Sequence, residues 1–279
     1  MTADLLAILW APFLMCLVLT GIHAYLGVHV LAREVVFVDI ALAQIAALGA
    51  TAAFLFGYEL DTWLSYVFGL TATLLGALVL ALTRSRTRHV SQEAVIGIVY
   101  AVSSAAAVLL VMSSPHGAEH LKAMLVGSLL AVGGGDVLKV AVLYAGVGLL
   151  HWYCRGPFFL ISEQPDAAYA RGLNVRAWDF LFYASFGVVV TSSVRIAGVL
   201  LVFSYLIVPA LAAVLVGGPI ARRLLFGWAF GAVVSVLGVG ASALFDLPTG
   251  ATVVCMFGAS LLVLWGGLRA LGRAMPSTV

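Results

Sequence analysis

Long apolar runs separated by short polar segments dominate the chain, and each run approaches the roughly 20 residues that a helix needs to cross a bilayer. The nine runs are 5–22, 35–56, 62–82, 93–112, 136–153, 178–193, 197–216, 224–244 and 250–268. Backbone amides and carbonyls inside lipid find no water, so each run must pair these groups within itself as an α-helix. The pattern therefore predicts an all-α, polytopic membrane helical bundle with about nine transmembrane helices.

A tenth apolar segment, 121–132, is too short to cross the bilayer and is followed by three glycines at 133–135. We expect it to lie at the membrane interface or to re-enter the membrane from one side. The sequence shows no convincing internal repeat and no domain linker, so residues 1–279 are predicted to form a single transmembrane domain.

The composition excludes a soluble protein. Only 9% of the residues are charged and 63% are hydrophobic, whereas a soluble domain carries about 25% charged residues. The formal net charge of +2 is too small to indicate a nucleic-acid partner. No basic residue precedes the first apolar run, so we expect a retained span rather than a cleaved signal peptide.

The basic residues fall unequally on the two sides of the predicted bundle. Numbering the loops alternately places eleven arginines on one side and only Lys122, Lys139 and Arg195 on the other. Because cytoplasmic loops carry the excess of Lys and Arg, the first side is predicted to be cytoplasmic. This orientation places the N-terminus outside and the C-terminus in the cytoplasm.

The longest predicted cytoplasmic loop, 154–177, contains the pattern of a short helix. Pro165 and Asp166 suit a first helical turn, while Arg171 and Gly172 suit the end of a helix. Such a helix can dock into a groove on a partner protein. It can equally lie at the membrane interface without a partner, and the periodicity leaves both interpretations open.

Two polar residues, Asp39 and Gln44, lie in the second apolar run. An ionisable side chain within a span usually faces a cavity, a pathway or a partner. Asp39 is only about one turn from the inner boundary, so a solvated interfacial carboxylate is the alternative, and Gln44 can instead hydrogen-bond across helices. His23 and His29 flank the first predicted inner loop and are interpreted as interface residues.

Proline and glycine mark two further positions. Pro209, inside the run 197–216, is predicted to break or kink its helix, which can line a pathway or can simply pack. Gly227 and Gly231 form a G-x-x-x-G pattern, which we interpret as close helix packing within the chain rather than a dimer contact.

An outer loop contains His116, Glu119 and His120, which match the H-x-x-E-H pattern of some zinc peptidases. That chemistry needs the three side chains on one helix, whereas Pro115 and Gly117 favour a loop. A transient landing place for a cation and a plain solvated loop are the other interpretations. The chain also lacks a G-x-x-x-x-G-K-[ST] pattern, so it does not carry this nucleotide-binding loop.

Four segments carry loose motifs whose order and spacing are more specific than any one of them. They are Gly27–Arg33 with Phe37–Gly49, Glu93–Ile98, Pro165–Gly172, and Val194–Ala210. Together they resemble the membrane-spanning permease of the zinc/manganese (divalent metal) ABC importer family, over about residues 12 to 270. The resemblance implies a type II ABC importer-like fold.

The chain departs from the family pattern at three positions. Aligned on Leu48 and Gly49, Gln44 takes the place of the family's histidine and Ile40 that of its aspartate. The carboxylate is instead Asp39, one residue earlier, which rotates the side chain by about 100° on a helix. Gln164 likewise replaces an aspartate of the family's coupling segment.

The resemblance implies that the chain imports zinc or manganese by alternating access in the cell (inner) membrane. It implies a homodimer, a cytoplasmic ATPase subunit that binds ATP, a metal-binding protein outside, and no cofactor on this chain. Coupling to the ATPase is expected from the segment 163–173, through Glu163, Pro165, Asp166, Ala168, Arg171 and Gly172. Asp39, Gln44 and His29 are expected along the metal pathway, with Pro209 at a gating kink, and His116, Glu119 and His120 as an outer landing site.

Three alternatives remain at this point. One is a permease for a metal chelate of the siderophore or cobalamin type. Another is an ATP-independent channel or secondary transporter, which would need no docking segment. The third is an intramembrane metalloprotease based on the H-x-x-E-H pattern.

Overall fold

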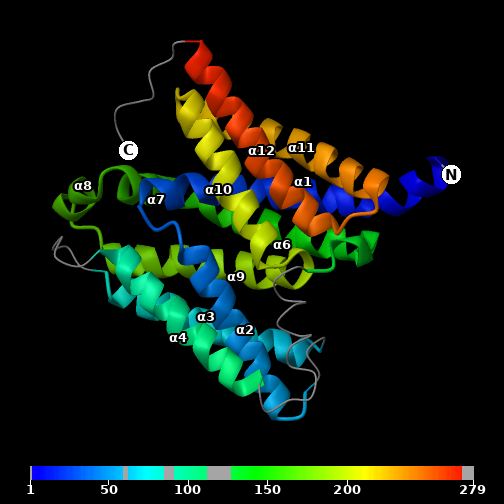
Figure 1. Ribbon diagram of the computed structural model, residues 1–279. Helices are drawn as coiled ribbons and strands as arrows, with labels where there is room; N and C mark the ends of the chain where they lie inside the picture. The colour runs from blue at the N-terminus through cyan, green and yellow to red at the C-terminus, as the bar shows by residue number, and fades with distance from the viewer. Residues whose placement is uncertain (1, 59–61, 85–90, 112–126, 272–279) are drawn as a thin grey trace. The chain divides into compact units, whose positions relative to one another are not determined.

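The computed structural model describes residues 2–58, 62–84, 91–111 and 127–271, and within these ranges all regular secondary structure is helical (Figure 1). The helices are α1 (Thr2–Ala32), α2 (Val38–Leu55), α3 (Trp63–Leu82), α4 (Gln92–Val111), the 3-10 turn η1 (Leu129–Ala131), α6 (Gly134–Tyr153), α7 (Arg155–Glu163), α8 (Pro165–Ala170), α9 (Val175–Ala197), α10 (Val199–Val216), α11 (Ile220–Phe245) and α12 (Thr249–Ala270). Nine of these described helices are long and apolar enough to cross a membrane. This confirms the predicted all-α bundle.

The chain divides into two compact units. Unit 1 comprises Met1–Ala32, Val126–Ala145 and Ile196–Val279, and unit 2 comprises Arg33–Leu125 and Gly146–Arg195. The helix α6 contributes its first part to unit 1 and its second part to unit 2.

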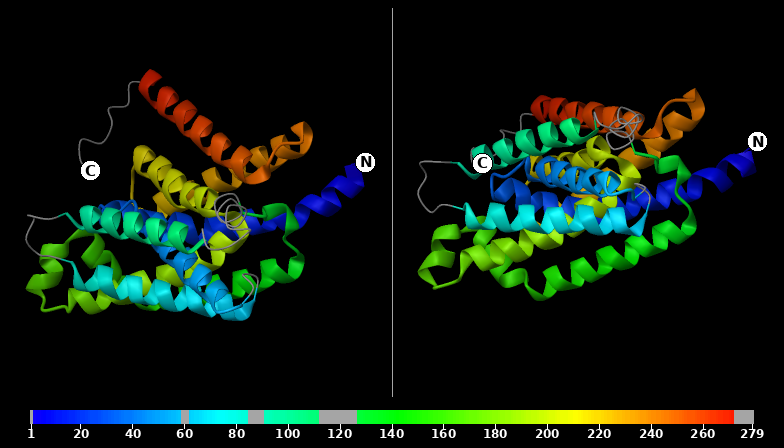
Figure 2. Two further views of the ribbon diagram at one scale, coloured as in Figure 1. Left: turned by 60° about the horizontal axis from the view of Figure 1, so that its bottom comes forward. Right: turned by 90° about the horizontal axis from the view of Figure 1, so that it is seen from below.

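In unit 1, α1 packs against α10 and α11, while α11 and α12 form a helical hairpin that also contacts α10 (Figure 2). The close approach of α1 to α10 requires Gly27, because a Cβ atom there would collide with the carbonyl oxygen of Leu206. Of the apolar segment predicted at 121–132, residues 121–126 lie outside the described residues. The part that follows contains η1, and the amide of Ser128 donates to the carbonyl of Ile196 at 2.9 Å.

In unit 2, α2 packs along both α3 and α4. Gly49 allows the close approach to α3, since a Cβ atom there would lie 2.6 Å from the carbonyl oxygen of Phe68. Thr73 of α3 and Thr191 of α9 share a buried hydrogen bond of 3.1 Å. These contacts hold α2, α3 and α9 together and place the polar ends of the three helices within reach of one another.

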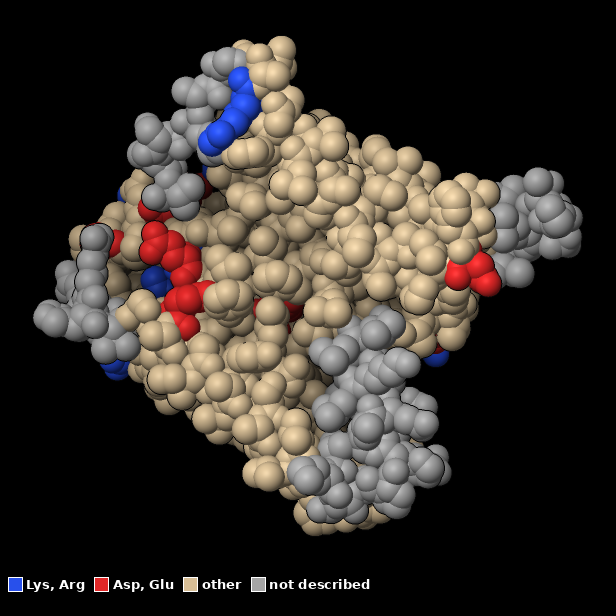
Figure 3. Space-filling model, viewed as in Figure 1, with Lys and Arg blue, Asp and Glu red and all other residues tan. Residues whose placement is uncertain are grey.

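Large apolar side chains remain exposed on several helices. On α12, Leu262 and Val263 are 69% and 76% exposed, and on α4, Ile98 and Leu109 are 64% and 68% exposed. Most of the surface seen in Figure 3 is neither acidic nor basic. Such a surface is unfavourable in water and suits lipid chains or the apolar face of another subunit.

Two sequence predictions need correction. The first span was predicted to end at residue 22, but α1 continues to Ala32. His23 and His29 therefore lie buried inside the helix and are not interface residues. A histidine is compatible with a buried helix where its ring has a partner, and Nδ1 of His23 hydrogen-bonds the carbonyl of Leu19 at 2.8 Å. Of the break or kink predicted at Pro209, the break is absent, since α10 runs through this residue, and the kink stays a prediction.

The G-x-x-x-G pattern packs within the chain, as predicted. A Cβ atom on Gly227 would lie 3.2 Å from the carbonyl oxygen of Pro209. A Cβ atom on Gly231 would lie 2.6 Å from the side chain of Thr20. The two glycines therefore let α11 approach α10 and α1.

Candidate functional site

The short helix predicted in the loop 154–177 is present, and a second helix precedes it. α7 covers Arg155–Glu163 and α8 covers Pro165–Ala170, with Pro165 in the first turn of α8. Gly172 has a φ of +72°, a left-handed conformation that suits the end of a helix. We call residues 155–173 the α7–α8 segment.

The α7–α8 segment has one buried side and one exposed side. Ile161 and Ala168 form an apolar cluster with Val175, which fixes the segment to the start of α9. The exposed members of the predicted coupling set are Glu163, Asp166, Arg171 and Gly172. An apolar underside on the bundle and a charged outer side are the features of a segment that can bind another protein.

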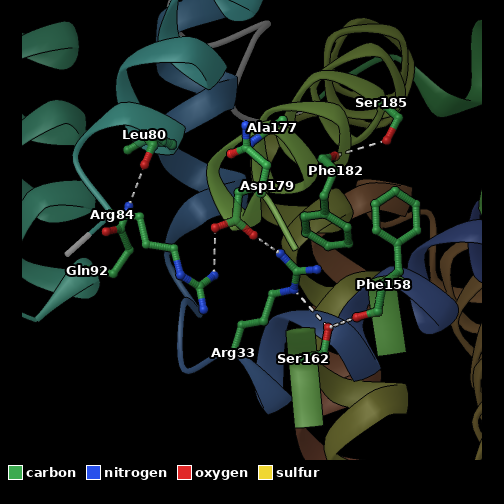
Figure 4. A network of polar contacts seen from close by, with 11 residues as sticks. Arg33, Leu80, Arg84, Gln92, Phe158, Ser162, Ala177, Asp179, Phe182 and Ser185 are labelled. Carbon is green, nitrogen blue, oxygen red and sulfur yellow. Dashed lines mark hydrogen bonds and ion pairs between the residues drawn. The ribbon is translucent and has the colours of Figure 1, made fainter. Parts of the chain in front are cut away.

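A buried group of charges contacts this segment through Ser162 (Figure 4). Arg33 donates from Nη1 to Oδ1 of Asp179 at 2.7 Å, and Nη1 of Arg84 lies 2.8 Å from Oδ2 of the same carboxylate. Nε of Arg33 donates to Oγ of Ser162 in α7 at 2.8 Å. We call Arg33, Asp179 and Arg84 the arginine–aspartate network.

The electrostatics of this network favour a fixed arrangement. The side chains of Arg33 and Asp179 are completely buried, and the guanidinium of Arg33 lies 4.0 Å from the centre of the Phe182 ring. Burial lowers the pKa of Arg33, and attraction to Asp179 opposes this shift. An arginine stays cationic in proteins, so one carboxylate here balances two guanidinium groups.

The network joins four parts of unit 2. Arg33 lies in the connection between α1 and α2, Arg84 follows the end of α3, Ser162 is in α7 and Asp179 is in α9. Two further contacts are made nearby: the amide of Phe37 donates to Oε1 of Glu93 at 3.0 Å, and Nε2 of Gln92 donates to the carbonyl of Leu80 at 2.8 Å. The starts of α2, α4 and α9 and the end of α3 therefore share one end of unit 2, as the predicted order of loops requires.

Asp39 lies in the first turn of α2 and is buried, with only 1% of its surface exposed. This excludes the solvated interfacial carboxylate that the sequence left open. Neither carboxylate oxygen has a hydrogen-bond partner among the described residues. Such a carboxylate is costly to bury as an anion and is suited to bind a cation or a proton.

Gln44 does not share the face of α2 on which Asp39 lies. They are five positions apart, which corresponds to about 140° around the helix. Gln44 and Ile40, which stand where the family pattern has its histidine and aspartate, are both half-buried. Asp39 and Gln44 therefore do not form the pair of ligands, one helical turn apart on the same face, that could bind one ion together.

His29 belongs to α1 in unit 1, where its ring packs edge-on against Tyr25 at a centroid distance of 4.9 Å. In the part of the chain that the structure describes, no group of three or more His, Cys, Asp or Glu side chains could hold a metal ion. The predicted outer site of His116, Glu119 and His120 lies outside the described residues.

Asp179 and Arg84 were not among the predicted site residues. The available signal was Asp179 itself, the single acidic residue of the apolar run 178–193. A carboxylate in such a run usually has a charged partner. The sequence does not say which basic residue that partner is.

The family follows from comparison with known proteins. The model of the ABC 3 transport family matches residues 6–266. The chain belongs to this family. It is a multi-pass membrane protein, and nine helices among its described residues are long and apolar enough to span a membrane.

The names of individual relatives differ in the cargo that they state. The manganese transport system membrane protein MntC of Listeria innocua is 29% identical over 187 residues, 67% of this chain and 65% of the relative. A probable iron transport system membrane protein of Haemophilus influenzae is 27% identical over 176 residues, 63% of this chain and 64% of the relative. The match thus spans just under two thirds of each relative's length.

A solved structure supports the fold over nearly the whole chain. PsaBC from Streptococcus pneumoniae in complex with Fab superimposes with a TM-score of 0.77 at 20% identity, covering 95% of each chain. At this identity the likeness concerns the fold.

Proposed function

We propose that this chain is the membrane-spanning permease of an ABC importer that carries a divalent transition metal, manganese or zinc, into the cell. A separate cytoplasmic ATPase would bind and hydrolyse ATP and drive alternating access. Membership of the ABC 3 transport family supports the transporter class. The name of the Listeria relative makes manganese the first cargo to test.

The observation that carries the proposal is the α7–α8 segment. Its buried side is fixed to α9 through Ala168, and its exposed side presents Glu163, Asp166 and Arg171. A channel or secondary transporter has no use for a docking helix of this kind. The segment therefore supports a partner protein at the end of unit 2 that the positive-inside rule assigns to the cytoplasm.

The metal pathway would involve Asp39, with Gln44 and His29 as further candidates and Pro209 at a gate. Asp39 is the strongest of these because it is buried and its oxygens find no partner among the described residues. A transported ion must be released as well as bound, so a sparse ligand set is consistent with transport. We further propose a homodimer, an extracytoplasmic metal-binding protein, and an N-terminus outside with the C-terminus in the cytoplasm.

Docking is tested by enlarging a buried residue of α8. Ala168→Leu should displace the α7–α8 segment, because Ala168 is completely buried against Ile161 and Val175. Ala170→Leu is the matched control, since Ala170 is exposed on the same helix. We expect Ala168→Leu to reduce co-purification of the ATPase at least roughly tenfold, as overpacking by 1–3 kcal/mol permits, while the control retains it.

Transport is tested in proteoliposomes that contain the permease and its ATPase. ATP-dependent uptake of radioactive manganese is expected, with zinc and iron as competing ions and a siderophore-bound metal as the chelate probe. Uptake that proceeds without any ATPase would overturn the importer proposal. If only the siderophore-bound metal is taken up, the cargo is a metal chelate and not a free ion.

A further inference from the structure

We infer that the arginine–aspartate network, together with Ser162, transmits movement of the α7–α8 segment to α2 and α3. Arg33, Ser162 and Asp179 would be positioning residues that couple ATP hydrolysis to opening of the metal pathway. The inference rests on the proposed function. It adds the contacts that connect the α7–α8 segment, where the ATPase would bind, to the start of α2, where the metal pathway would lie.

The link begins at Ser162, in the last turn of α7 and directly before the exposed Glu163. Its hydroxyl donates to the carbonyl of Phe158 at 2.8 Å and accepts from Nε of Arg33 at 2.8 Å. With its proton used inside α7, the oxygen is held toward Arg33. A displacement of the end of α7 must therefore move Arg33 or break this bond.

α9 supplies the second connection to the same segment. Val175 packs with Ile161 and Ala168 of the α7–α8 segment, and Asp179 lies four residues later in α9. Residues four apart lie on one face of a helix. The first turns of α9 thus contact the segment through Val175 and contact both arginines through Asp179.

Arg33 passes the movement on to α2. It is the first residue of unit 2, and Glu34 beside it has a φ of +56°, a left-handed conformation unusual for a residue other than glycine. Only four residues separate Arg33 from Val38, where α2 begins, and Asp39 follows immediately. A shift of the Arg33 side chain therefore acts on the start of α2, next to the buried carboxylate.

Charge makes this connection stiff. Arg33 cannot leave Asp179 without becoming an unpaired buried cation, so the two groups must move together or exchange partners. Arg84 holds the other oxygen of Asp179 and lies two residues beyond α3, so the end of α3 follows the same carboxylate. Apolar packing at this position would fill the space without tying these elements to one point.

The test uses the complete permease–ATPase complex in proteoliposomes and measures metal ions transported per ATP hydrolysed. Two variants are compared with the wild type: Ser162→Ala, and the double variant Arg33→Met/Asp179→Leu, which replaces the buried pair by apolar groups of similar size. Thr73→Val is the matched control, because it removes a buried hydrogen bond between α3 and α9 away from the α7–α8 segment. We expect both test variants to bind the ATPase as the wild type does. Ser162→Ala should lower the transport ratio by roughly tenfold, the effect of one lost hydrogen bond to a charged group. The double variant removes both ion pairs of Asp179 and should lower the ratio at least as much.

A second measurement separates this inference from the proposed cargo. Hydrogen exchange of Val38–Leu55 is followed in the complex with and without an ATP analogue. The wild type and Thr73→Val should show a nucleotide-dependent change that Ser162→Ala loses. If this pattern holds while no metal is transported, the cargo proposal fails and the coupling inference stands. Wild-type transport ratios and wild-type exchange in both test variants would overturn the inference, as would an ATPase that does not bind at all.

Discussion

Both compact units hold helices together through glycine contacts and neutral buried hydrogen bonds, and unit 2 adds a group of buried charges. In unit 1 the examples are the 2.8 Å hydrogen bond between Tyr205 and Ser235 and the close approach of α1 to α10 at Gly27. In unit 2 two carboxylates, Asp39 and Asp179, are buried, and one of them is bound by arginines. Burying a neutral hydrogen-bonded group costs little free energy, whereas burying a charge costs much more unless a partner of opposite charge compensates it. The feature that distinguishes unit 2 is therefore its buried charge, which is the feature that the inferred transmission needs.

The largest test of this contrast removes the shared carboxylate. Asp179→Asn leaves Arg33 buried without a counter-charge, and we expect a loss of about 3–5 kcal/mol in the free energy of unfolding. Thermal unfolding in detergent, followed by the intrinsic fluorescence of the tryptophans, measures the effect. Glu163→Gln, an exposed change nearby, is the control and should leave the midpoint unchanged. Equal midpoints for the two variants would show that the network is not tightly coupled.

A smaller effect is expected from close packing in unit 1. Gly27→Ala places a methyl group against the backbone of Leu206, and we expect a loss of about 1–3 kcal/mol as α1 and α10 are pushed apart. Gly21→Ala lies on the same helix with nothing within 4 Å of the new atom, so it should be neutral or slightly stabilising. The same unfolding assay compares the pair. If Gly27→Ala is as stable as Gly21→Ala, the close packing of α1 against α10 does not contribute to the stability of unit 1.

The smallest effect is expected from a neutral hydrogen bond. Tyr205→Phe removes the hydroxyl that contacts Ser235, whose own hydroxyl still bonds the carbonyl of Gly231 at 2.6 Å. We expect a loss of about 1 kcal/mol. Tyr153→Phe, at a residue that is 89% exposed, should show none. A loss as large as that of Asp179→Asn would erase the distinction between the units.

Much of the fold could be predicted because hydropathy is a local property. The number of spans, their approximate limits and the helix that begins at Pro165 followed from residues within a few positions of one another. The predicted end of the first span was wrong, because α1 continues through the polar residues His23 and His29. Polar histidines indicate a loop or an interface by their hydropathy, although a buried helix accommodates them.

The candidate site divides in the same way. The α7–α8 segment could be recognised from its own residues, and so could Asp39 as a carboxylate in an apolar run. The contact between Arg33 and Asp179 joins residues 146 positions apart, and no periodicity reports such a distance. Which of the arginines on that side would meet the carboxylate could not be read from spacing.

The sequence by itself determined that the chain is a bundle of membrane helices with a short amphipathic segment at one end, because lipid imposes helix on every long apolar run. The tertiary structure alone decided that Arg33, Arg84 and Asp179 meet next to that segment and that Asp39 is buried rather than solvated. The physical reason is range: hydrophobic pattern and helix ends depend on neighbours in the chain, whereas the pairing of buried charges depends on which helices pack together.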